Sequence, residues 1–111
     1  MGLATYVQVG DMVDYTPGSA VSEGDVVVQN TLVGVATRDI AASALGALAV
    51  SGVFDFPKSD ASSSAIEAGK KVYWDSTNEV ATETSSGNTY LGKTTAAADD
   101  DDTTVRVRLE Q

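Results

Sequence analysis

The segment Thr103–Leu109 reads Thr-Thr-Val-Arg-Val-Arg-Leu. Two valines and a leucine alternate in it with threonine and arginine. Successive side chains of a β-strand point to opposite faces of a sheet, so this alternation is typical of a strand with one apolar face. We therefore expect that face to pack in a core, and the cationic face to lie in water or against a partner.

Short runs of the same kind occupy most of the chain. They are rich in valine, threonine and tyrosine, and glycine, aspartate, asparagine and serine separate them. They predict strands, with at most one short helix at Ser62–Ala68 and turns at Thr16–Ser19 and Ser85–Asn88. With 111 residues, the chain is expected to form a single all-β domain, a small barrel or sandwich over residues 1–111. The predicted strands are Thr5–Val9, Met12–Tyr15, Asp25–Gln29, Leu32–Ala36, Ala47–Phe56, Lys71–Trp74, Glu79–Glu83, Thr89–Thr94 and Thr103–Leu109.

A weak internal repeat is visible in the sequence. Gly24–Val28 resembles Gly69–Tyr73, and each segment is followed by a strand centred on glycine, Leu32–Val35 and Tyr90–Lys93. Each of those strands leads through an alanine-rich connection to a long strand. Two similar halves of one pseudo-symmetric barrel or sandwich explain this pattern, and chance similarity between simple β segments is the alternative.

Composition excludes several kinds of chemistry. The chain has no histidine and no cysteine, so Ser-His-Asp and Cys-His catalysis, disulfides and imidazole or thiolate metal sites are excluded. Sixteen acidic and seven basic residues give a net charge of -9, and the basic residues form no cluster along the sequence. We expect no nucleic-acid binding. The longest apolar stretch, Ala41–Val50, is too short to cross a bilayer, and we expect no membrane association.

Residues Gly87–Thr94 match the nucleotide-binding pattern G-x-x-x-x-G-K-[ST], with Gly87, Gly92, Lys93 and Thr94 at its fixed positions. A true phosphate loop follows a buried strand and opens a helix whose N-terminus faces the phosphates. Here the preceding residues are polar, and only a short alanine run precedes four aspartates. We therefore interpret the match as a decoy within a strand, with no cofactor.

The acidic run Asp99–Asp102 has two interpretations. It is either a solvated turn between strands or a calcium loop. Calcium loops space their carboxylates along the chain, as in D-x-D-x-D, so four consecutive aspartates favour the turn. No pair of carboxylates stands apart as an acid–base couple. We therefore expect no metal site and no catalytic site.

The order of several segments resembles the small capsid cement, or head decoration, proteins of tailed bacteriophages. The most specific are Gly52–Lys58, of the form G-V-F-x-x-P-K, and Ala65–Asp75, of the form A-I-x-x-G-x-x-V-Y-W-D. The resemblance covers nearly the whole chain, from a Gly-Asp at residues 10–11 to the strand at Thr104–Leu109. Lys93 departs from it, because the family more often has an apolar residue there.

The resemblance implies an all-β protein without catalytic residues on the outer surface of an assembled phage head, over junctions between major capsid proteins. We expect a homo-oligomer, a trimer or alternatively a dimer. A free-standing β binding module that recognises sugars is the competing class. A small nucleotide-dependent enzyme is a third class, supported only by residues 87–94.

The expected interface candidates are mostly in residues 1–9. This segment is half apolar, and it could add as a strand to a neighbour's sheet or be the ordinary first strand of the domain. Aromatic side chains at Phe54, Phe56, Tyr73 and Trp74 could anchor an interface. The alternative is that Phe54 and Tyr73 or Trp74 belong to the core. The candidate interface residues are Leu3, Tyr6, Val7, Val9 and Phe56.

Overall fold

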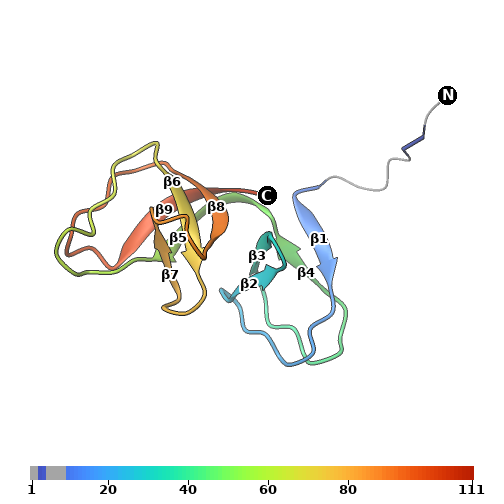
Figure 1. Cartoon of the computed structure of the whole chain (residues 1–111). Helices are drawn as coiled ribbons and strands as arrows, with labels where there is room; N and C mark the ends of the chain where they lie inside the picture. Colours follow the sequence, from blue (N-terminus) through green and yellow to red (C-terminus); the bar gives the residue numbers. More distant parts are fainter. Residues whose placement is uncertain (1–2, 5–9) are drawn as a thin grey trace.

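The computed structural model describes residues 3–4 and 10–111. The described residues form nine strands and no helix (Figure 1). The predicted strand Thr5–Val9 lies outside them. The strands are β1 (Met12–Tyr15), β2 (Val26–Gln29), β3 (Leu32–Ala36), β4 (Gly46–Ala49), β5 (Ser51–Pro57), β6 (Lys71–Asp75), β7 (Val80–Thr82), β8 (Thr89–Thr94) and β9 (Thr104–Glu110).

The strands form two antiparallel sheets. The first has the order β1-β4-β3-β2 and the second the order β5-β9-β8-β6-β7. Figure 1 shows the two sheets side by side, with the C-terminus between them. Over the described residues neither sheet closes into a barrel, so the fold is all-β and sandwich-like.

The predicted strand Ala47–Phe56 is divided between the two sheets, which corrects the sequence interpretation. β4 ends at Ala49, β5 begins at Ser51, and the buried residue between them, Val50, donates its N–H to the Asp11 carbonyl at 3.0 Å. Gly52 follows with φ of 118°, a conformation that side-chain-bearing residues rarely adopt. The chain therefore changes sheets where its apolar pattern reads as one continuous strand.

The predicted helix at Ser62–Ala68 is wrong. Within this segment Ile66 exchanges two backbone hydrogen bonds with Ala98, at 2.9 and 2.8 Å, so its polar groups pair across the fold and not along a helix. Ser63 has φ of 64°, which a right-handed helix excludes. The Ile66 side chain is nevertheless buried and belongs to the hydrophobic core.

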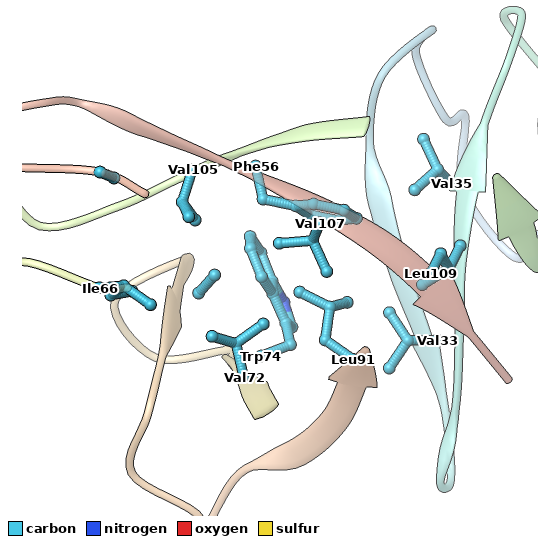
Figure 2. Close-up of a cluster of buried hydrophobic side chains, with 12 residues drawn as sticks. Val33, Val35, Phe56, Ile66, Val72, Trp74, Leu91, Val105, Val107 and Leu109 are labelled. Atoms are coloured by element: carbon cyan, nitrogen blue, oxygen red, sulfur yellow. The ribbon is translucent and has the colours of Figure 1, made fainter. Parts of the chain in front are cut away.

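The alternation in the last strand is confirmed. Val105, Val107 and Leu109 are at most 1% exposed, and the threonine and arginines between them are exposed. β9 lies between β5 and β8, so its inward side chains reach the middle of the core. Phe56 and Trp74 pack beside them with ring centroids 6.1 Å apart (Figure 2).

The core continues from the second sheet into the first. Val33 and Val35 of β3 belong to the same buried cluster as Leu91 and Leu109 (Figure 2). The Gln111 side chain also bridges the sheets: its Oε1 accepts the Val33 N–H at 2.8 Å, and its Nε2 donates to the Leu91 carbonyl at 3.0 Å. Apolar packing and this amide therefore join the two sheets into one unit.

Gly92 marks a close approach between β8 and β9. A Cβ atom there would lie 1.9 Å from the Arg108 carbonyl oxygen, a backbone atom that cannot swing away. Between Gly92 and Tyr90 the register with β6 shifts, which leaves Leu91 as an extra residue on β8. Such a bulge redirects side chains along its strand.

We predict that Gly92→Ala destabilises the fold by about 1–3 kcal/mol or more, because β8 and β9 must separate to admit the methyl group. The matched control is Gly18→Ala, where nothing lies within 4 Å of the added atom; we expect a change below about 0.5 kcal/mol. Urea unfolding of both variants measures the difference. Equal stabilities would contradict the close approach.

Candidate functional site

The segment that matches the phosphate-loop pattern is mostly strand. The strand predicted at Thr89–Thr94 is confirmed as β8, hydrogen-bonded between β6 and β9. The Thr94 side chain is buried; its hydroxyl donates to the Glu67 carbonyl at 2.6 Å and accepts the Lys70 N–H at 3.0 Å. A phosphate cradle needs unpaired amides that lead into a helix N-terminus. In the described chain this segment has sheet partners and leads into no helix.

The two glycines of the pattern have local structural roles. Gly87 lies in a turn with φ of 75°, closed by a hydrogen bond from the Asn88 N–H to the Ser85 carbonyl at 3.1 Å. This is the turn predicted at Ser85–Asn88. Gly92 faces the β9 backbone as described above.

Lys58 is a buried cation that sequence analysis did not single out. It is 5% exposed, and its Nζ donates to the carbonyls of Ser59, Asp100 and Asp102 at 2.6, 3.3 and 3.2 Å and to the Ser64 hydroxyl at 3.1 Å. Its position in the sequence was the available signal: Lys58 continues the two-residue spacing of the inward-facing Phe54 and Phe56, directly after the end of β5.

The acidic run wraps this cation with its backbone. Asp99–Asp102 is an exposed turn, in which the Asp102 N–H donates to the Asp99 carbonyl at 3.1 Å and the Asp99 N–H to Asp102 Oδ2 at 2.8 Å. Asp100 Oδ1 accepts the Ala65 N–H at 2.8 Å. Two of the four carboxylates thus hold loops in place. Among the described residues, no three acidic side chains converge as metal ligands would.

The predicted interface residues have different positions. Leu3 is 95% exposed, whereas Tyr6, Val7 and Val9 lie outside the described residues. Phe56 is 1% exposed and sits in the core, so its side chain is inaccessible to a partner and the interface interpretation is wrong for it. Phe54 packs against it, edge to face, with ring centroids 6.1 Å apart.

The other two aromatic candidates lie on opposite faces of β6. Trp74 is buried in the core, and Tyr73 faces outward and is only half-buried. Tyr73 packs edge to face on Tyr90 of β8 with ring centroids 5.7 Å apart. The second sheet therefore keeps one aromatic pair near its outer surface.

The described surface offers edge strands and shallow hollows. β1 and β2 are the edge strands of the first sheet, and β5 and β7 those of the second, where Lys58 after β5 forms an isolated bridge with Ala81 of β7. One hollow of about 560 Å³ lies beside β2, lined by Val26, Val27, Trp74 and Glu79 among others. The described part of the chain contains no helix that is long and apolar enough to span a bilayer. These features suit contacts with protein surfaces better than enclosure of a small substrate.

A family model described as phage cement protein matches residues 7–109, nearly the whole chain. The chain belongs to the phage cement protein family. The resemblance inferred from the sequence is thereby confirmed, and membership indicates a structural, non-enzymatic role in the phage capsid. No curated protein and no solved structure matches the chain.

We predict that Lys58→Met destabilises this cement protein by about 1–3 kcal/mol, because three carbonyls and a hydroxyl lose a buried charged donor. The matched control is Lys70→Met, which removes a charge from an exposed position and should change the free energy of unfolding by less than about 0.5 kcal/mol. Chemical unfolding compares the two variants. Similar stabilities would show that the four hydrogen bonds of the Lys58 ammonium contribute nothing to the free energy of unfolding.

Addition of ATP and Mg²⁺ should leave the melting temperature unchanged, because β8 lies between β6 and β9 in a sheet and leads into no helix among the described residues. A ligand of the folded state raises that temperature in proportion to its saturation. Differential scanning calorimetry with millimolar nucleotide checks this, with Mg²⁺ alone as the control. A nucleotide-dependent rise would restore the phosphate-loop interpretation.

Proposed function

We propose that this protein binds the outer surface of the assembled phage head, bridges major capsid proteins and stabilises the expanded shell. The family match over residues 7–109 carries the proposal. The chemistry of the chain is consistent with it, since a protein without histidine or cysteine lacks the commonest catalytic groups. The proposed role needs only complementary surfaces.

Stabilisation follows from linkage. A ligand that binds the expanded shell and not its precursor lowers the free energy of the expanded state. Each contact can be weak when one oligomer bridges several capsid subunits, because the first contact raises the effective concentration for the next. A domain of this size can therefore act through many modest interfaces.

The proposed assembly is a trimer at local threefold positions, with a dimer as the alternative. Each sheet of the described chain ends in two edge strands, and open edges carry unpaired N–H and C=O groups that favour pairing. Pairing between copies would cover some of these edges.

The proposed capsid contact is the N-terminal segment Gly2–Val9. Leu3 is 95% exposed, and the segment leads into β1, an edge strand of the first sheet. A half-apolar segment of this length can add as a strand to the sheet of a neighbouring protein.

We also propose that the two sheets are related as an internal repeat. In the first sheet Val21 and Ile40 exchange two backbone hydrogen bonds, at 2.8 Å each, as Ile66 and Ala98 do in the second. The orders β1-β4-β3-β2 and β5-β9-β8-β6 correspond strand by strand, with β7 as an addition. Under this proposal, each half of the chain presents a similar edge, β1 or β5.

Purified protein incubated with undecorated expanded heads should co-sediment with them to saturation and raise the temperature at which they rupture. Unexpanded precursor heads are the matched control and should bind less. Absence of co-sedimentation at any concentration would refute the proposed function.

Deletion of residues 1–6 should abolish binding to heads, because the proposed docking strand is then lost, and should leave the melting temperature of the isolated protein within a few degrees. Co-sedimentation and calorimetry on the same preparation separate the two effects. Unchanged occupancy on heads would assign docking to another surface.

A further inference from the structure

The outer face of the five-stranded sheet carries a row of three cations. Lys71 of β6 lies directly opposite Lys93 of β8, and Lys93 lies directly opposite Arg108 of β9. All three residues are exposed. Neighbouring strands are about 4.8 Å apart, so the row crosses three strands within roughly 10 Å.

This arrangement lowers the stability of the folded protein. Like charges directly opposite each other on adjacent strands are destabilising. Among the described residues neither lysine has an ion pair, and Arg108 meets only Glu110, at 3.5 Å, with the arginine side chain 66% exposed and the glutamate side chain 32% exposed. The two lysines of the row therefore lack carboxylates that would balance their charge.

A balanced pair on the same face shows the contrast. Two residues before Arg108 on β9, Arg106 lies opposite Asp55 of β5, and its Nε donates to Asp55 Oδ1 at 3.0 Å. This hydrogen bond holds the pKa of the Asp55 carboxyl below its ordinary value. The chain thus places a carboxylate opposite one arginine and none opposite the two lysines.

The charge of the whole molecule makes the row more distinctive. The chain has seven basic residues and a net charge of -9, yet three of those bases stand side by side on one face. Such a patch on an acidic molecule orients its approach to a partner of opposite charge.

The neighbours of the row are typical of protein interfaces. On one side the Tyr73–Tyr90 pair lies half-buried on the same face. At the β5 end Val53, directly opposite Arg108, is 54% exposed. Interfaces are enriched in tyrosine and arginine around apolar contacts.

We propose that this face docks onto a carboxylate-rich protein surface. Resting on the function proposed above, that surface is an acidic strip on the major capsid protein. Three cations on a molecule of this net charge match a local group of carboxylates better than a nucleic acid, whose continuous phosphates would also meet the surrounding acidic surface.

The substitution Lys93→Glu tests the proposal, because it reverses the central charge of the row. The new carboxylate lies opposite Lys71 and Arg108, so the melting temperature should rise by about 2–5 °C. Binding to empty expanded heads should weaken at least tenfold. Lys71→Glu is a second variant with the same expected loss of binding.

The matched control is Arg38→Glu, which makes the same change in net charge at an exposed position after β3. It should bind heads like the unmodified protein. Binding of the unmodified protein should weaken as sodium chloride rises from about 50 to 500 mM, and the residual binding of Lys93→Glu should depend on salt less.

Four outcomes would overturn the proposal, and they are distinguishable. If Lys93→Glu binds heads as Arg38→Glu does, the face is not the docking surface although the proposed function stands. If the unmodified protein does not bind heads, the proposed function fails and the named partner with it. Binding to duplex DNA that Lys93→Glu removes would assign the face to nucleic acid. Self-association that Lys93→Glu removes, measured by sedimentation velocity, would assign it to a second copy.

Discussion

The packing of β9 between β5 and β8 is the constraint on which the rest of the structure depends. Its inward side chains are at most 1% exposed and form the centre of the core, while its outward arginines face solvent. The approach of β8 is so close that only glycine fits at position 92. The same pairing places Lys93 opposite Arg108. The pairing of β8 with β9 therefore determines both the core on its inner face and the cationic row on its outer face.

The two sheets act as one unit because the chain and the core both cross between them. The passage from β4 to β5 takes a single buried residue, Val50. Val33 and Val35 extend the same apolar cluster into the first sheet, and Gln111 links β3 to β8 through its amide. The two sheets consequently share one core and cannot separate without exposing it.

The sequence predicted most of the strands, because period-two alternation and glycine-containing turns are local signals. It could not place the break at Val50, where apolar residues continue through a change of sheet. The helix expected at Ser62–Ala68 failed because Ile66 pairs with Ala98, a distant residue that no local pattern reveals. Phe56 was assigned to the interface candidates, since alternation shows which side chains share a face of a strand and not how deeply that face is buried. The cationic row was also invisible: its members are scattered along the chain, and only strand register brings them together.

The hydrogen bonds that hold the Lys58 ammonium have a consequence for how this protein responds to the ions in its medium. Calcium-binding loops are organised by a dissolved ion, whose occupancy follows the external concentration. Here an ammonium tethered by its own side chain meets the inward-facing carbonyls of the acidic turn. Neither dilution nor a chelator can remove this ammonium. The acidic turn therefore keeps its bound cation when divalent ions are withdrawn from the medium.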